Sequence, residues 1–196
     1  MDTTISAYLK NHAEYAKRHL HDYQLRPLRI FTRMLKDKGR ILDAGCGPGR
    51  DLKYFISKGY NAIGIDLCDH FIEHARRSGL HVLKMDMRSL EFSDGYFDGV
   101  WCCASFYHIP SKDALGTLIG FNRVLKDRGA LFISVKEGKG ERLLEDRLDN
   151  RSKKFYRFYL IGELFHLADD AGFDVLLSKR EMGEYSVWLQ FLMRKR

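Results

Sequence analysis

The stretch Ile41-Leu42-Asp43-Ala44-Gly45-Cys46-Gly47-Pro48-Gly49 runs from a short apolar segment straight into three glycines at alternate positions. Glycine has no Cβ, so the chain can turn tightly there and a ligand can touch the backbone. The helix that we expect after it presents free N–H groups at its N-terminus. Glycine-rich turns also occur without a ligand, so the stretch by itself leaves a binding loop and a plain turn as alternatives.

The spacing of these glycines differs from the usual dinucleotide-binding pattern. That pattern, G-x-G-x-x-G, would put its third glycine at position 50, which is Arg50, and Gly49 comes one residue too early. The spacing therefore argues against a nicotinamide-dependent oxidoreductase, although this class stays among the alternatives.

Strand-like and helix-like segments alternate on both sides of the loop. The strand-like segments are nearly continuous apolar runs, which are typical of strands that are covered on both faces. Regular alternation predicts an α/β fold with a parallel sheet between two layers of helices. The expected strands span residues 40–44, 61–66, 81–85, 97–104, 130–135, 173–177 and 187–193, and the expected helices span residues 5–20, 27–39, 51–58, 69–77, 111–126 and 161–171.

Local signals predict where some of these helices begin and which side chains they bury. Pro27 is expected to open the second helix and Gly39 to end it. Ser111 is expected to cap the helix at 111–126. The expected inward positions of the first, second and fifth helices are Ala7, Tyr8, Tyr15, Ala16, Leu20, Leu28, Phe31, Met34, Leu35, Leu115, Leu118, Ile119 and Leu125.

The length and composition favour one ordinary globular domain. A chain of 196 residues with 45% hydrophobic and 30% charged residues can bury a sizeable core. We therefore treat residues 1–196 as a single domain, with N-terminal helices at 1–38 and an insert at 137–159. No apolar run approaches the ~20 residues of a membrane span, and the N-terminus has no secretory-signal pattern, so a cytoplasmic protein is expected. The cysteines and histidines form no zinc pattern, and we expect free thiols and no metal.

The net charge is +7, and the basic excess is spread over more than one segment. Residues 1–40 hold nine Lys and Arg against four Asp and Glu, and residues 136–157 hold eight against five. A basic surface can attract RNA or an anionic small molecule. A solvated surface without a partner explains the same composition.

Two acidic residues follow the next two expected strands. Asp66 ends the strand at 61–66, 21 residues after Gly45, and Asp86 follows the strand at 81–85. A carboxylate at the first point can accept hydrogen bonds from ribose hydroxyls, and one at the second can accept them from an adenine amine. Ligands of such sheets bind at the carboxyl ends of the strands, so the loop and the two acids together predict a nucleoside site.

With these features the sequence resembles the class I S-adenosylmethionine-dependent methyltransferases, in particular their small methyltransferase-domain members. The resemblance covers roughly residues 8–194 and is most specific between 41 and 135. It implies a Rossmann-like three-layer sandwich with a seven-stranded, mostly parallel sheet whose last strand is antiparallel. Asp127 and Arg128 replace the usual Pro-Gly before the fifth strand, a departure that affects a turn and not the site. The matching segments are 41–49, Gly64-Ile65-Asp66, Asp86-Met87, Phe97-Asp98-Gly99-Val100-Trp101 and 123–131.

The resemblance also implies which residues hold the cofactor, S-adenosyl-L-methionine, and its product S-adenosyl-L-homocysteine. The backbone around the glycines would hold the methionine portion, Asp66 the ribose, and Leu67, Asp86 and Met87 the adenine. The carbonyl of Cys102 would meet the amino group, Tyr15 would cover the ligand, and Arg50 and Asp51 would line the loop. The cofactor-binding residues expected in this way are Asp43, Ala44, Gly45, Cys46, Gly47, Arg50, Asp66, Leu67, Asp86, Met87, Cys102 and Tyr15.

Methyl transfer from a sulfonium needs in-line positioning, and a general base only if the acceptor is protonated. His108 is the best-placed candidate base, and a structural histidine in the turn Phe106-Tyr107-His108-Ile109-Pro110 is the alternative. No Asn/Asp-Pro-Pro-Tyr/Phe motif follows the fourth strand, which disfavours adenine methylation. Cys102-Cys103 lacks the Pro-Cys context of cytosine-modifying enzymes. A small-molecule acceptor is therefore the leading interpretation.

The insert at 137–159 contains Lys153-Lys154-Phe155-Tyr156-Arg157-Phe158-Tyr159, in which basic and aromatic residues mix. Such a segment can hold an anionic or aromatic acceptor or stack on unpaired bases. We expect it to cover the acceptor pocket; the start of a helix with buried aromatic residues is the alternative. Two further interpretations of the whole chain stay open: an RNA methyltransferase and a protein that binds S-adenosylmethionine without turning it over.

Overall fold

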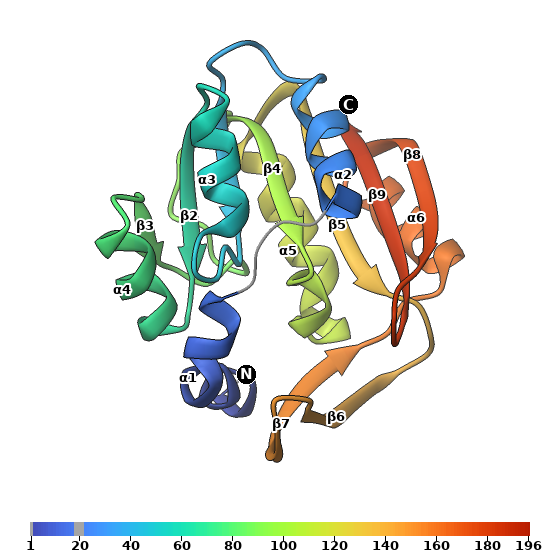
Figure 1. The fold of residues 1–196 in the computed structure, drawn as a ribbon. Helices are drawn as coiled ribbons and strands as arrows, with labels where there is room; N and C mark the ends of the chain where they lie inside the picture. Colours follow the sequence, from blue (N-terminus) through green and yellow to red (C-terminus); the bar gives the residue numbers. More distant parts are fainter. Residues whose placement is uncertain (1, 18–21) are drawn as a thin grey trace.

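The computed structural model describes residues 2–17 and 22–196. A seven-stranded sheet forms its centre, with the strand order β3-β2-β1-β4-β5-β9-β8 (Figure 1). β1, β2, β3, β4 and β5 run parallel, and β9 runs antiparallel to both of its neighbours. The strands are β1 (Arg40–Ala44), β2 (Asn61–Asp66), β3 (Val82–Lys84), β4 (Phe97–Cys103), β5 (Leu125–Lys136), β8 (Phe173–Met182) and β9 (Val187–Lys195). The α/β fold with its antiparallel last strand is therefore confirmed.

Helices cover both faces of the sheet, because side chains alternate along each strand. Leu42, Val100 and Leu131 belong to one buried cluster together with residues of α5 and α6. Their neighbours Ile41 and Trp101 face the other way, into a cluster with α2, α3 and α4. The helices are α1 (Asp2–Ala16), α2 (Asp22–Thr32), α3 (Arg50–Ser57), α4 (Asp69–Arg77), the short 3₁₀ helix η1 (Phe106–His108), α5 (Ser111–Val124) and α6 (Ile161–Asp170).

The second helix differs from its prediction at both ends. α2 begins at Asp22, and Pro27 lies inside it instead of opening it. Leu25 packs on the same cluster as Leu28, one turn earlier, which extends the helix backwards. α2 ends at Thr32 and not at Gly39, because turns with three-residue spacing follow it. The predicted first helix is confirmed up to Ala16; Leu20 lies outside the described residues.

The predicted cap of α5 was wrong, and so was one of its inward positions. Pro110 occupies the N-cap position and Ser111 is the first helical residue. The buried stripe falls on Ala114, Thr117, Leu118, Phe121 and Val124, at helical spacing, so the next residue along from Leu118 turns outward. Ile119 is accordingly 49% exposed.

The insert forms a hairpin and not the start of a helix. β6 (Glu141–Asp146) pairs antiparallel with β7 (Asp149–Arg157) as a separate two-stranded sheet. The hairpin and α1 both lie at the end of the molecule toward which the parallel strands point (Figure 1). Among the described residues, no helix is long and apolar enough to cross a membrane. Arg128 adopts a left-handed conformation (φ 64°) in the turn where the family pattern has a glycine.

Candidate functional site

The glycine loop lies between β1 and α3, and its three glycines do different things. Gly45 (φ 79°) and Gly49 (φ 88°) have left-handed backbones, and an added Cβ would collide with Ser105 and Leu80, respectively. Gly47 (φ 55°) is different, because the nearest atom to its missing Cβ is a ring carbon of Phe71 at 4.0 Å. A Cβ on Gly47 would therefore make only ordinary van der Waals contact with Phe71, and it is the left-handed φ of Gly47, not a collision, that favours glycine there.

Asp66 holds this loop against the neighbouring one. Its Oδ2 accepts a hydrogen bond from the N–H of Gly47 (2.8 Å), and its Oδ1 accepts from Leu67 (2.8 Å) and Cys68 (2.9 Å). Burial raises the pKa of Asp66, and these three N–H donors oppose the rise. A carboxylate oxygen has two lone pairs, so Oδ2 can accept one more hydrogen bond from a ligand.

The side chains of Asp86 and Met87, which follow β3, point in different directions. Asp86 faces outward to Arg88, whose guanidinium Nη2 lies 2.6 Å from Oδ2. Although burial raises it, hydrogen bonds from Arg88 hold the pKa of Asp86 below its ordinary value. Met87 instead points to the loop: its sulfur lies 4.0 Å from that of Cys102, and its Cε lies 3.3 Å from the position of a Cβ on Gly45.

Two buried acidic residues, Asp43 and Asp51, lie under the loop. Asp51 accepts hydrogen bonds from Arg50 Nε (2.7 Å) and Trp101 Nε1 (2.9 Å). Asp43 is 3% exposed, and its Oδ2 has no hydrogen-bond partner. Burial, followed by the nearby charge of Asp51, raises the pKa of Asp43. An unpaired buried oxygen is costly, and a bound cationic amine would satisfy it.

Two tyrosines of α1 lie close to the loop, next to Phe71. The rings of Tyr8 and Tyr15 lie 5.7 and 6.0 Å from Phe71, the ring nearest to Gly47. The structure therefore brings Tyr15 close to the glycine loop, and its contact with the cofactor stays a prediction. Sequence reasoning missed Tyr8, Phe71 and Ser105 as site residues. The spacing of seven residues between Tyr8 and Tyr15 was the available signal, because it puts both on one helix face.

Both ring nitrogens of His108 make hydrogen bonds. Its Nδ1 lies 2.6 Å from the carbonyl oxygen of Phe155, which can only accept, so this nitrogen carries the proton. Its Nε2 then accepts a hydrogen bond from the hydroxyl of Tyr8 (2.9 Å). Burial lowers the pKa of His108 to about 3, so the ring stays neutral at ordinary pH.

The thiols near the loop are poor nucleophiles. Cys46 and Cys102 are buried, and burial raises the pKa of both. Burial also raises the pKa of Cys103 to about 12. Ala44 is fully buried in the core, so it can meet a ligand only through its backbone.

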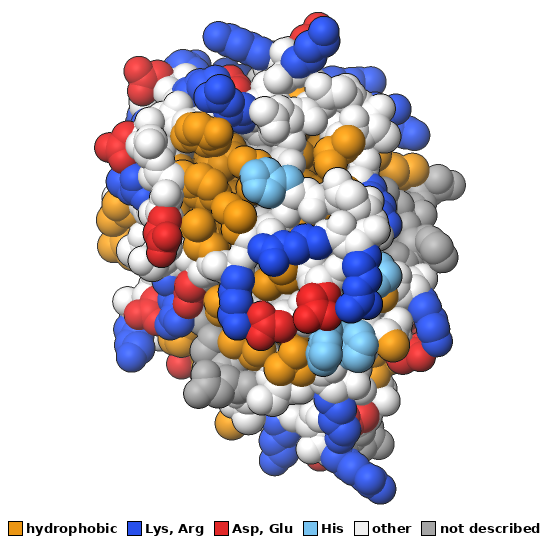
Figure 2. Space-filling model, turned by 90° about the vertical axis from the view of Figure 1, so that its left-hand side faces the viewer, with side chains coloured by type: hydrophobic (Ala, Val, Ile, Leu, Met, Phe, Trp, Pro, Cys, Tyr) orange, Lys and Arg blue, Asp and Glu red, His pale blue; other side chains and the backbone are white. Residues whose placement is uncertain are grey.

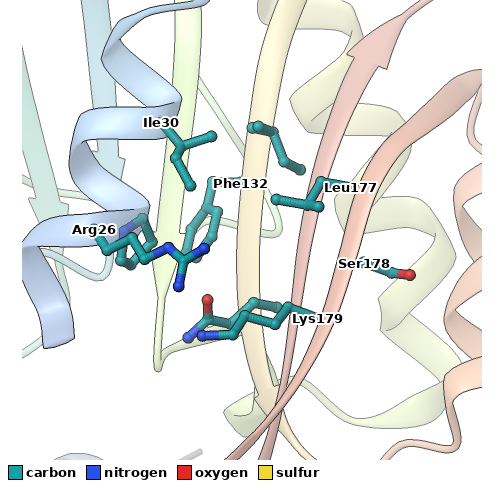
Figure 3. A pocket seen from close by; sticks show the side chains of 9 residues that line it. Arg26, Ile30, Phe132, Leu177, Ser178 and Lys179 are labelled. Atoms are coloured by element: carbon teal, nitrogen blue, oxygen red, sulfur yellow. The ribbon is translucent and has the colours of Figure 1, made fainter.

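A separate cavity of about 210 Å³ lies away from the loop, between α2 and the strands β5, β8 and β9. Figure 3 shows Arg26 and Ile30 of α2 facing Phe132, Leu177 and Lys179 across it. None of its lining residues is a predicted site residue. The cavity therefore says nothing about the glycine loop.

Comparison with known proteins agrees with this geometry. The family described as "Methyltransferase domain" matches residues 41–129. The putative methyltransferase YqeM of Bacillus subtilis is 36% identical over 108 residues, which cover 52% of this chain and 44% of that protein. The probable tRNA methyltransferase 9B of Mus musculus is 30% identical over 109 residues, which cover 55% of this chain and 24% of that protein. The chain thus spans less than half the length of these two curated relatives.

The fold is similar to several solved structures, and one of them matches nearly the whole chain. It is the Burkholderia thailandensis 1,6-didemethyltoxoflavin-N1-methyltransferase with bound 1,6-didemethyltoxoflavin and S-adenosylhomocysteine. The sequences are 25% identical and the TM-score is 0.78, over 97% of this chain and 86% of the other.

Proposed function

Because the chain belongs to the class I S-adenosylmethionine-dependent methyltransferases, we propose that it binds S-adenosylmethionine at the glycine loop and transfers the methyl group to a small-molecule acceptor. The observation that carries the proposal is the glycine loop after β1, with the Asp66 carboxylate bonded to the N–H of Gly47 and the rings of Phe71 and Tyr8 beside it. The unpartnered oxygen of Asp43 suits the cationic amine of the methionine portion.

The roles of the individual residues follow from their positions. The backbone from Ala44 to Gly47 holds the methionine portion, and the carbonyl of Cys102 accepts from its amine. Asp66 accepts from a ribose hydroxyl through the remaining lone pair of Oδ2. Leu67 packs on the adenine, and Asp86 and Met87 frame it. Asp43 and Arg50 lie beneath the loop, where Asp51 fixes the guanidinium.

When bound, the cofactor supplies a methyl group that its sulfonium already activates. The chain's own residues then have to exclude water and align the acceptor. Tyr8, Tyr15 and Phe71 form an aromatic cover over the loop, which removes water from the transfer site. His108 as a general base stays a prediction; its two hydrogen bonds and its lowered pKa favour instead a positioning role for the Tyr8 hydroxyl.

A small molecule is favoured as the acceptor for two reasons. Three aromatic rings, those of Tyr8, Tyr15 and Phe71, lie together beside the glycine loop, and they suit a small acceptor better than a polymer. The face in Figure 2 carries basic and acidic side chains interspersed with one another, and not a continuous basic surface. RNA is the second candidate, on the net charge of +7 and the likeness to the probable tRNA methyltransferase.

Calorimetry with S-adenosylhomocysteine and NAD, side by side, tests the cofactor. We expect S-adenosylhomocysteine to bind and NAD not to bind; binding of NAD alone would overturn the proposal. A transfer assay with labelled donor, over small-molecule extracts and total RNA, then tests the acceptor. Label in the extract supports a small acceptor, and label in RNA with a steep salt dependence supports the second candidate. Binding without any transfer would point to a non-catalytic binding protein.

A further inference from the structure

A half-buried lysine lies at the carboxyl end of β5, inside a ring of aromatic side chains. The ammonium of Lys136 lies 4.4 Å from the ring centroid of Tyr156, 5.7 Å from Tyr107 and 5.9 Å from Trp188. Lys136 and Trp188 are register partners in β5 and β9, and Tyr107 and Tyr156 stack at 5.4 Å. We name Lys136, Tyr107, Tyr156 and Trp188 the lysine box.

The charge of Lys136 has no counter-ion within residues 2–17 and 22–196. The adjacent Glu137 is engaged elsewhere, with Arg180 at 2.7 Å. The nearby charges are cationic: burial, and then Arg147 and Lys154, lower the pKa of Lys136 to about 8. Lys154 is already paired with Asp146 at 2.8 Å. Aromatic faces stabilise an ammonium, but they leave its N–H donors without acceptors.

The lysine box adjoins the proposed transfer site. The ring of Tyr107 lies 4.5 Å from that of His108, which lies 5.6 Å from Tyr8. The ring of Tyr8 in turn lies 5.7 Å from that of Phe71, which is the ring nearest to Gly47 of the glycine loop. A chain of ring contacts therefore connects the box with the place where the methyl group would be transferred.

We infer that the acceptor is a small organic acid whose anionic oxygens pair with Lys136 in the lysine box. The inference rests on the proposed function, since it names the acceptor class of the same site. A carboxylate would supply the acceptors that the ammonium lacks, and the flanking rings would pack on an aromatic body. Nucleic-acid phosphates are held mainly by exposed basic side chains along a surface, whereas Lys136 is half-buried beside three aromatic rings.

The test uses the full chain saturated with S-adenosylhomocysteine, and benzoate as the probe. Calorimetry compares benzoate with benzamide, its uncharged isostere, and with a 20-nucleotide RNA. Lys136→Gln removes the charge, Lys136→Arg keeps it, and Lys139→Gln is the matched control, an exposed lysine three residues away. We expect Lys136→Gln to weaken benzoate binding about tenfold, as the loss of a charge-assisted hydrogen bond does. Benzamide binding and the Lys139→Gln variant should show no change.

A pH series gives a second readout. Benzoate binding to the wild type should weaken between pH 7 and 9, because Lys136 loses its proton there. Of the groups that face Lys136, His108 stays neutral in that range and Lys154 is paired with Asp146. The other groups that face it are Arg147, Tyr107 and Tyr156. Lys136→Arg should keep the binding and flatten this profile.

Several results would overturn the inference. They are equal binding of benzoate and benzamide, no benzoate binding at all, full benzoate affinity in Lys136→Gln, or an effect of Lys136→Gln on RNA alone. Failure of S-adenosylhomocysteine to bind the wild type would instead reject the proposed function, so the two failures are distinguishable. Unchanged S-adenosylhomocysteine affinity in Lys136→Gln shows that the variant is folded.

Discussion

At the scale of single residues, Asp66 serves the fold and the ligand at once. Its three backbone hydrogen bonds join the loops after β1 and β2. Its Oδ2 lies beside Gly47 of the glycine loop, where the nucleoside is proposed to bind. A binding carboxylate that is already fixed by the backbone needs no reorganisation when the ligand arrives.

Asp66→Asn should weaken S-adenosylhomocysteine binding by about 1.5–3 kcal/mol, or roughly ten- to a hundredfold, because a hydrogen bond to a charged acceptor is lost. Calorimetry measures the affinity. Glu91→Gln is the matched control, since it removes the charge of an exposed acid outside the site and should change nothing. An unchanged affinity in Asp66→Asn would remove Asp66 from the binding site.

His108 should make stability depend on pH in the acid range. Its pKa is about 3 in the folded chain and 6.5 in the unfolded chain. The unfolded chain therefore binds one more proton between these values, and the free energy of unfolding falls as pH falls through this window. The slope is about 1.4 kcal/mol per pH unit.

His108→Gln keeps a donor and an acceptor in the same place and has no titratable group. Urea unfolding at pH 7, 6, 5 and 4 should give a shallower loss of stability in this variant than in the wild type. Acids with raised pKa values, such as Asp43, affect both chains alike and cancel in the difference. Parallel profiles would contradict the buried neutral state. Unchanged turnover in His108→Ala would exclude it as the base.

At the scale of elements, α1 is held in place by the hairpin of β6 and β7. Lys154 and Asp146 form an ion pair in which both side chains are almost fully buried. Asn11 of α1 donates to Asp146 (2.9 Å), and Tyr15 contacts both charged residues. The N-terminal helix and the insert thus close the same end of the sheet as one unit, as a cover of the site requires.

Breaking this pair should loosen the cover. Lys154→Met leaves a buried carboxylate without its cation, which should cost about 3–5 kcal/mol of unfolding free energy. The double variant Lys154→Met/Asp146→Leu should cost less, because no buried charge then stays unpaired. Lys153→Met, at the exposed neighbouring position, is the matched control and should be nearly neutral. Urea unfolding measures all of these variants, and a double variant no better than Lys154→Met would contradict this account.

At the scale of the whole molecule, the surface charge selects no partner by itself. Basic and acidic side chains intermingle on the face shown in Figure 2, where hydrophobic side chains also gather in the upper part. The net charge of +7 is therefore the sum of scattered charges, and it is not concentrated in one patch on this face. The proposed specificity comes instead from the lysine box, whose cation is half-buried.

Ligand binding should stabilise the entire fold, because the site draws on β1, β2, β4 and α1 together. S-adenosylhomocysteine at a hundred times its Kd should add about 2.7 kcal/mol, which raises Tm by roughly 5–10 °C in a chain of this size. Thermal unfolding followed by circular dichroism measures the shift. NAD at the same concentration should not shift Tm. S-adenosylhomocysteine should not shift the Tm of a variant that no longer binds it.

The sequence by itself determined the sheet and most of its helices, and it predicts the line of proposed cofactor residues from Asp43 to Met87. These depend on local causes: apolar runs that form strands, glycines with positive φ, and acids that follow strand ends. Such signals are contained within a few consecutive residues, so they could be predicted from the chain alone. The β1, β2 and α4 boundaries agree with the predictions residue by residue.

The tertiary structure alone decided how distant segments meet. The partners of His108 are Tyr8, 100 residues before it, and Phe155, 47 residues after it, and neither spacing is visible in a local pattern. The hairpin arises because β7 pairs with β6 and packs on α1, which overrides any helical preference of its mixed basic and aromatic residues. The lysine box likewise joins the end of β5 to η1, β7 and β9. Contacts between remote segments depend on the packing of the whole chain. This is why the glycine loop could be predicted from the sequence, while the partners of His108, the hairpin and the lysine box could not.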